Sequence, residues 1–206
     1  MDKPKGKQAV EAAIRLIEEQ LQAIPVAVAT ILHAPALDKQ QLDAIAGSMQ
    51  LLRKPRAGST ASVGNIIIAD ADSDVKLDFE TSYRALQDDL AAKDKYLRIV
   101  IGNALLAVGA FFREFGMADM RTPEVQFLDR IHDAVLNGNR FALDADRPAV
   151  ASFAGLNIEQ SQDGMPLFGA DGQAGFMEFG DAVALLQWLA HYLRGGENFV
   201  TAGDAG

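Results

Sequence analysis

The chain has 206 residues, 49% of them hydrophobic and 23% charged, which is the balance of a folded globular protein rather than a disordered one. It contains no cysteine, and this excludes disulfides, thiolate nucleophiles and cysteine-ligated metal centres. The 28 acidic side chains outnumber the 19 basic ones and lie mostly after residue 60, for a net charge of −9. Because duplex nucleic acids are bound by neutralising phosphates, we expect no partner of that kind.

The sequence predicts neither a signal peptide nor a membrane span. Residues 1–7 lead into an amphipathic segment, not into the apolar core of a signal peptide. The most apolar stretch runs over residues 96–112 and is interrupted by Arg98 and Asn103. A membrane span needs about 20 predominantly apolar residues, so this stretch is predicted to be a core helix. We therefore expect a cytoplasmic protein without a membrane partner.

The first predicted element is an amphipathic helix over residues 8–24. Its apolar positions recur every three or four residues, as a helix requires: Val10, Ile14, Ile17, Leu21 and Ile24. Pro25 is expected to end this helix, because proline inside a helix removes a backbone hydrogen bond. Residues 26–33 fit either a strand or a second helix, and we favour the helix.

A second helix is predicted to begin after Asp38. Gln41 stands three residues further on, which is the spacing of a capping box. The helix is expected to run to about Lys54. Small and polar residues then predict a flexible loop over about 55–64. Three cations lie around the start of that loop and are candidates for binding a partner or an anion: Arg53, Lys54 and Arg56.

Two apolar runs, residues 65–69 and 75–79, are predicted to pair as a β-hairpin across residues 70–74. Three carboxylates stand at alternate positions of that connection: Asp70, Asp72 and Asp74. Alternate side chains of an extended chain share a face, so these carboxylates are candidate ligands for a divalent cation. The sequence does not match an EF-hand loop, which needs glycine where Val75 stands and glutamate where Thr81 stands. The competing interpretation is a solvated turn, since Asp and Ser bond their own backbone there.

A long helical region is predicted from about residue 80 to residue 115. Its part over residues 99–112 is apolar nearly all round, and such a helix must be covered on every side. We therefore predict a buried central helix over about 96–114, which a second subunit could help to cover. Gly102 and Gly109 share one face of this helix and permit another helix to approach closely.

The next helix is predicted to begin at Pro123, because Thr122 suits the N-cap and proline suits the first helical position. It is expected to end before Gly138. His132 lies on it, flanked by Asp129 and Asp133. Carboxylates beside an imidazole can orient it for base chemistry or metal binding, but we favour a histidine at the edge of the core, bonded to a neighbour.

The C-terminal third is predicted to contain short β-strands followed by one helix. Four short β-like runs predict a small antiparallel sheet, namely residues 140–143, 150–153, 156–159 and 175–179. Asp181 is predicted to cap a last helix that ends at Arg194, before two glycines. Trp188 lies on this helix and, if exposed, would suit a partner interface.

These elements predict a predominantly helical α+β fold, with a helix bundle around the central helix and a small antiparallel sheet in the C-terminal third. We expect one domain over residues 1–206, with loose termini at 1–7 and 197–206. No catalytic residue and no cofactor is indicated, apart from the possible divalent cation.

The leading functional prediction is a non-catalytic protein that acts through protein–protein association. An accessory subunit, an adaptor, an acidic chaperone or a neutralising partner would all fit, either as a homo-oligomer or with a protein partner. One alternative is a cation-dependent enzyme on a phosphorylated or nucleotide substrate, using the three aspartates. Another is a small-ligand-binding domain with an apolar pocket.

Overall fold

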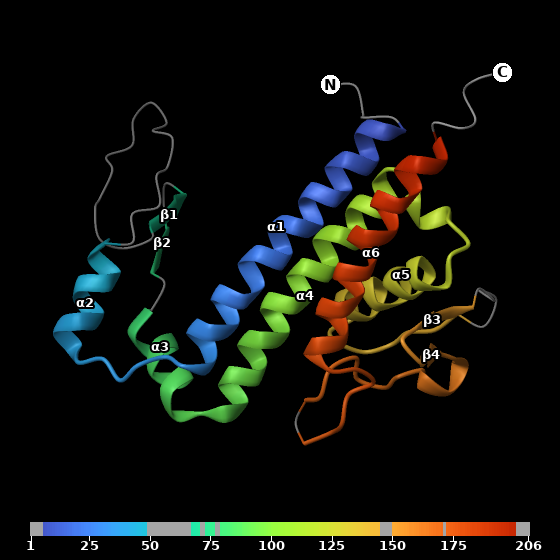
Figure 1. Ribbon diagram of the computed structural model, residues 1–206. Coiled ribbons are helices and arrows are strands. Elements are labelled where there is room, and N and C mark those ends of the chain that lie inside the picture. The colour runs from blue at the N-terminus through green and yellow to red at the C-terminus, as the bar shows by residue number, and fades with distance from the viewer. Residues whose placement is uncertain are drawn as a thin grey trace. The chain divides into compact units, whose positions relative to one another are not determined.

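The computed structural model describes residues 6–48, 67–70, 73–76, 79–144, 150–170 and 172–200 (Figure 1). The predicted loop at 55–64 lies outside these residues. The chain divides into two compact units, residues 1–29 with 94–206, and residues 30–93. The single domain expected from the sequence stays a prediction.

The larger unit is a helix bundle. It consists of most of α1 (Lys7–Leu32) and α4 (Leu90–Glu114), with α5 (Pro123–Leu136) and α6 (Phe179–Val200) (Figure 1). Short 3₁₀ turns lie at Met117–Asp119 and Gln160–Gln162. Two short strands, β3 (Ala151–Phe153) and β4 (Leu156–Ile158), pair antiparallel in the C-terminal part. The predominantly helical α+β fold is therefore confirmed.

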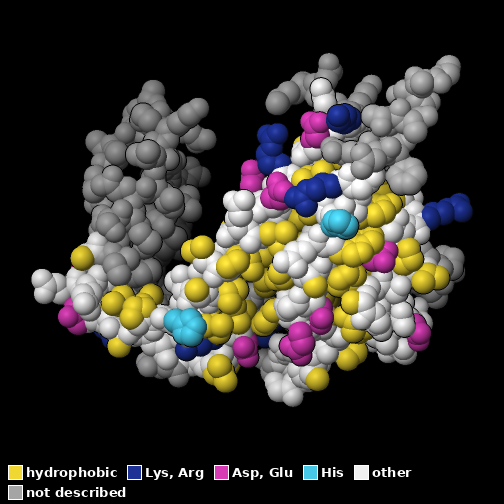
Figure 2. Space-filling model, viewed as in Figure 1, with side chains coloured by type: hydrophobic (Ala, Val, Ile, Leu, Met, Phe, Trp, Pro, Cys, Tyr) yellow, Lys and Arg dark blue, Asp and Glu magenta, His cyan; other side chains and the backbone are white. Residues whose placement is uncertain are grey.

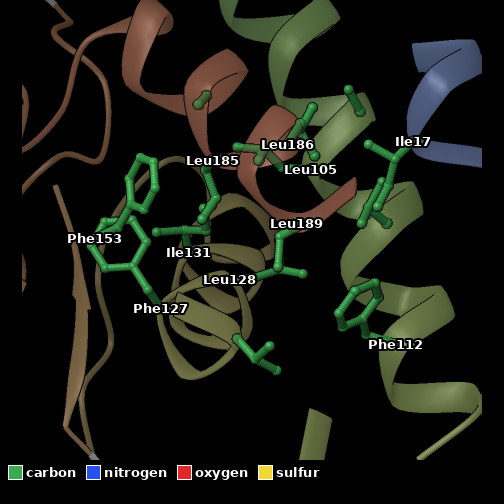
Figure 3. Close-up of a cluster of buried hydrophobic side chains, with 14 of the residues drawn as sticks. Ile17, Leu105, Phe112, Phe127, Leu128, Ile131, Phe153, Leu185, Leu186 and Leu189 are labelled. Atoms are coloured by element: carbon green, nitrogen blue, oxygen red, sulfur yellow. The ribbon is translucent and has the colours of Figure 1, made fainter. Parts of the chain in front are cut away.

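The core of this unit forms where α4, α5 and α6 converge. Leu105 of α4, Leu128 of α5 and Leu189 of α6 meet there and are almost completely buried (Figure 3). Phe127 of α5 packs against Phe153 of β3, with ring centroids 6.1 Å apart. The predicted central helix is α4, which contributes a continuous row of buried side chains: Leu97, Ile101, Ala104, Leu105, Val108 and Phe112. Helix α4 is also long and apolar enough to cross a membrane, a criterion that the buried core helix of a soluble protein meets as well.

Helix α1 differs from its prediction in two ways. It continues through Pro25 to Leu32, so the predicted end at Pro25 is wrong, while the helix favoured for residues 26–33 is confirmed to Leu32. Pro25 lies on an exposed face, where water can bond the carbonyl that loses its partner.

The buried stripe of α1 is also rotated from the predicted one. Ala9 and Ala13 lie in the core beside Ile17, whereas Val10 and Ile14 are only partly buried. Small alanine side chains let α1 approach its neighbours closely, and the larger side chains then lie at the edge of the contact. On the face shown in Figure 2, hydrophobic side chains gather in a band over α1 and α6.

Two helix boundaries also differ from the sequence predictions. The predicted helix over 80–115 is two helices, α3 (Phe79–Asp88) and α4, because Asp89 ends one and caps the next. Its Oδ1 accepts a hydrogen bond from the Ala91 amide at 2.8 Å. The last helix, α6, does not stop at Arg194 but continues through two glycines to Val200.

Only two of the four strands predicted in the C-terminal third are regular strands, namely β3 and β4. Residues 140–143 and 175–179 are not strands, although both segments were predicted to join the sheet. Both segments still form backbone hydrogen bonds with the intervening residues 165–167. The Phe141 amide donates to the Met165 carbonyl, and the Met177 amide donates to the Leu167 carbonyl, each at 3.0 Å. Pro166, which has no amide hydrogen, interrupts this ladder and keeps it irregular.

The smaller unit contains α2 (Lys39–Ser48), β1 (Ile67–Asp70), β2 (Ser73–Lys76) and α3. The predicted capping box is confirmed: the Gln41 amide donates to Asp38 Oδ1 at 2.8 Å, and the Asp38 amide donates to Gln41 Oε1 at 2.9 Å. The predicted hairpin is confirmed as well, with β1 and β2 antiparallel. Its connection is shorter than the predicted one, because Asp70 already pairs with Ser73.

Candidate functional site

The three aspartates proposed as cation ligands lie at the β1–β2 hairpin. Asp70 is the last residue of β1, and Asp74 pairs with Ala69 inside β2. Asp72 lies outside the described residues, and of the other two the structure describes only the backbone. The cation site therefore stays a prediction. Elsewhere in the described parts of the chain, no three His, Asp or Glu side chains are grouped as a metal ion would require.

The cations Arg53, Lys54 and Arg56 lie outside the described residues, so their role stays a prediction too. Trp188 is described and is half-buried on α6. Its indole stacks on the ring of Tyr192 with centroids 5.0 Å apart and an interplanar angle of 9°. The hydroxyls of Tyr192 and Thr122 lie 2.9 Å apart in a hydrogen bond. Trp188 is thus held on a fixed platform, with one part of its side chain left accessible.

A partly buried ionic cluster joins the C-terminal end of α4 to α5. Arg113 Nε donates to Asp129 Oδ1 at 2.6 Å, and Nη2 donates to the Asp129 backbone carbonyl at 3.0 Å. Arg113 Nη1 lies 2.8 Å from Asp133 Oδ1. The hydrogen bond to Asp133 raises the pKa of Arg113, and the one to Asp129 adds to this. One guanidinium therefore holds two carboxylates on successive turns of α5.

His132 lies beside this cluster, with only 7% of its side chain exposed. Burial lowers the pKa of His132, and the nearby charge of Arg113 lowers it further. Its Nδ1 has no hydrogen-bond partner, and the distance of 3.6 Å to Asp133 Oδ1 is beyond hydrogen-bonding range. The core position predicted from the sequence is confirmed, while the expected bond to a neighbour is not made. The imidazole instead packs between α4 and α5, against Gly109.

Sequence reasoning did not pair Arg113 with the α5 carboxylates. A signal was present, since Arg113 is the first charge after the apolar run of α4, and Asp129 and Asp133 are spaced four apart on one helix face. The close approach predicted for Gly102 and Gly109 is confirmed. A Cβ added at Gly102 would lie 3.3 Å from Val135 Cγ1, and one at Gly109 would lie 2.6 Å from His132 Cδ2.

The neighbours of α4 do not cover it completely. One strip of it, Ile99, Asn103, Leu106 and Ala110, remains open to solvent; we call it the α4 strip. Ile99 is 46% exposed, Asn103 and Ala110 are exposed, and Leu106 is half-buried. No charged residue lies between Arg98 and Arg113, so the whole strip is uncharged. The strip spans about 17 Å at 1.5 Å per residue.

The apolar surface continues beyond α4. Leu136, at the end of α5, is 63% exposed. Its chain neighbour Val135 lines the same pocket as Ile99, which brings the end of α5 next to the first residue of the α4 strip. The uncharged α4 strip is therefore the strongest candidate for a functional site among the described residues. Comparisons of the chain with protein-family models, with curated proteins and with solved structures found no match.

Proposed function

We propose that this protein acts through protein–protein association, as a subunit or adaptor, and that its α4 strip binds a second copy of the chain. The observation that carries the proposal is the open, uncharged strip on the central helix of the bundle. Water contact with Ile99 and Leu136 is unfavourable, since burying one such side chain contributes about 1.5–3 kcal/mol. A partner helix laid along the strip would remove this surface from water.

The spacing of the strip favours a helix as the partner. Ile99, Asn103, Leu106 and Ala110 follow one another at intervals of four, three and four residues, which is the spacing of a coiled-coil seam. Ala110 is exposed and small enough to let a second helix come close. A single asparagine in such a seam fixes register, because its amide is satisfied by the same amide of a second copy.

Charge supports a second copy over an unrelated acidic or basic partner. The chain carries −9 overall, so two copies repel each other, and the repulsion is smallest where the apposed surfaces carry no charge of their own. The α4 strip is such a place. Apposed strips bury no charge, and the cost of desolvating an unpaired ion does not arise. The same patch on both copies is what an isologous twofold interface requires.

Sedimentation velocity on two matched variants tests the proposal. Ala110→Glu puts a charge at the C-terminal end of the seam, while Ala184→Glu makes the same change at an exposed alanine on another helix, α6. We expect Ala110→Glu to weaken self-association by at least tenfold, about 1.4 kcal/mol, and Ala184→Glu to leave it unchanged. Equal behaviour of the two variants, or no self-association of the wild type at any concentration, would refute the proposed interface.

A further inference from the structure

A pocket of about 300 Å³ lies between the first half of α4 and the C-terminal end of α5. Its lining is mostly apolar and includes Ile99, Val135 and Phe168. All the lining residues belong to the larger unit, within residues 94–206. The volume lies at the lower end of the range of about 300–1,000 Å³ for small-molecule sites, which fits a ligand with a short apolar body.

The wall of the pocket is held in place by specific bonds. Asn139 adopts a left-handed backbone conformation with φ of 69°. Its side chain bonds both backbone groups of Phe168: Nδ2 donates to the carbonyl at 2.8 Å, and Oδ1 accepts from the amide at 3.0 Å. Asn139 thereby fixes the aromatic wall as a neighbouring strand would. A preformed wall reduces the ordering that a ligand must bring about on binding.

Two cations border the apolar lining. Lys95 is exposed, and Arg98 is anchored by a hydrogen bond from Nη1 to the Gly169 carbonyl at 2.7 Å. The C-terminal end of α5 also borders the pocket, but a helix end carries only about half a negative charge. Two full positive charges outweigh it. In a chain with a net charge of −9, this pocket is therefore a local site of positive charge.

We propose that this pocket binds a small amphiphilic carboxylate. The apolar body of the ligand lies against Ile99, Val135 and Phe168, and its carboxylate is bound by Lys95 and Arg98. The inference does not rest on self-association, but the pocket shares Ile99 and Asn103 with the α4 strip, so ligand and second copy would contact the same two residues.

Calorimetric titration with octanoate, and with octanol as an uncharged ligand of the same chain length, tests the proposal. We expect one octanoate per chain and clearly weaker binding of octanol. Lys95→Met is expected to weaken octanoate binding by about threefold to fivefold, as loss of one exposed ion pair does. The control is Lys93→Met, the same change two residues earlier on α4 and outside the pocket lining.

Three outcomes would overturn the carboxylate site. These are no heat with octanoate at millimolar concentration, equal affinity for octanoate and octanol, and equal effects of Lys95→Met and Lys93→Met. The titration is repeated in Ala110→Glu, which removes the proposed self-association without touching the pocket lining. Octanoate binding to Ala110→Glu shows whether the pocket binds its ligand even if the proposed interface does not form.

Discussion

Gly109 of α4 and His132 of α5 face each other so closely that Gly109 has no room for a side-chain carbon. A Cβ built at Gly109 would lie 2.6 Å from His132 Cδ2 and 2.9 Å from His132 Cβ. The second contact matters more, because the Cβ of His132 is fixed to the backbone and cannot rotate away. The separation of α4 and α5 is therefore set by this pair.

Gly109→Ala is expected to destabilise the protein. Overpacking costs about 1–3 kcal/mol, which outweighs the gain of up to about 1 kcal/mol from the helix propensity of alanine. Urea unfolding followed by circular dichroism measures the change. Gly102→Ala is the control, since its new Cβ meets only Val135 Cγ1 at 3.3 Å. If both substitutions shift the midpoint equally, the close contact at Gly109 is not what limits helix approach.

Stability is expected to fall as the pH drops below about 6.5, through His132. Burial and the charge of Arg113 lower its pKa in the folded state from the ordinary value of 6.5. The unfolded chain then takes up this proton first, so the unfolded state is favoured as the pH decreases. The loss continues until the pH is below the folded pKa. NMR titration of the His132 imidazole gives that pKa directly, and a value at or above 6.5 would contradict the prediction.

Arg113→Met is expected to destabilise the protein by about 3 kcal/mol, the lower end of the range for breaking a buried ion pair. The lower end applies because the Arg113 side chain is 32% exposed, whereas that of Asp129 is only 8% exposed. Urea unfolding measures the loss.

The same substitution should also raise the pKa of His132, since the charge of Arg113 contributes to lowering it. NMR titration of the variant checks this coupling. An unchanged His132 pKa would show that burial alone lowers it. Arg84→Met is the control for the unfolding measurement, because it breaks an exposed i,i+4 pair with Glu80 and should cost about 0.5 kcal/mol or less.

Gly175→Ala is expected to disrupt the C-terminal segment. A Cβ there would lie 2.3 Å from the Gly169 backbone nitrogen and 2.5 Å from the Phe168 carbonyl carbon, and backbone atoms cannot rotate out of the way. We expect a loss of more than about 2 kcal/mol, measured by thermal unfolding. Gly180→Ala, whose new Cβ meets nothing within 4 Å, should change stability little. A mild effect at Gly175 would mean that the segment adjusts freely.

The sequence was sufficient where local chemistry decides the structure. Asp38 with Gln41, and Thr122 with Pro123, mark helix starts that the structure confirms, because these signals act within one turn. The central helix was predictable because an all-round apolar segment can be covered only inside the bundle. The runs predicted at 150–153 and 156–159 form β3 and β4, but the sequence analysis did not identify the tight turn between them, which Ala154 and Gly155 make.

Long-range packing decided the features that the sequence did not predict. Pro25 remains inside α1 because its position turned out to be exposed, and exposure depends on the bundle. The pairing of Arg113 with Asp129 spans two helices, so it depends on their relative placement. The α4 strip has the same cause: periodicity shows that α4 is apolar, but not which side its neighbours leave open.

The measurement that tests the central claim most directly is the molar mass of the wild-type protein by light scattering on a sizing column, at several concentrations. One chain has a mass of 22.1 kDa. Association through the α4 strip predicts twice that mass at high concentration, with Ala110→Glu returning to the single-chain mass. A wild-type protein that stays at 22.1 kDa over the whole range would contradict the account, and the open strip would then be an ordinary exposed surface.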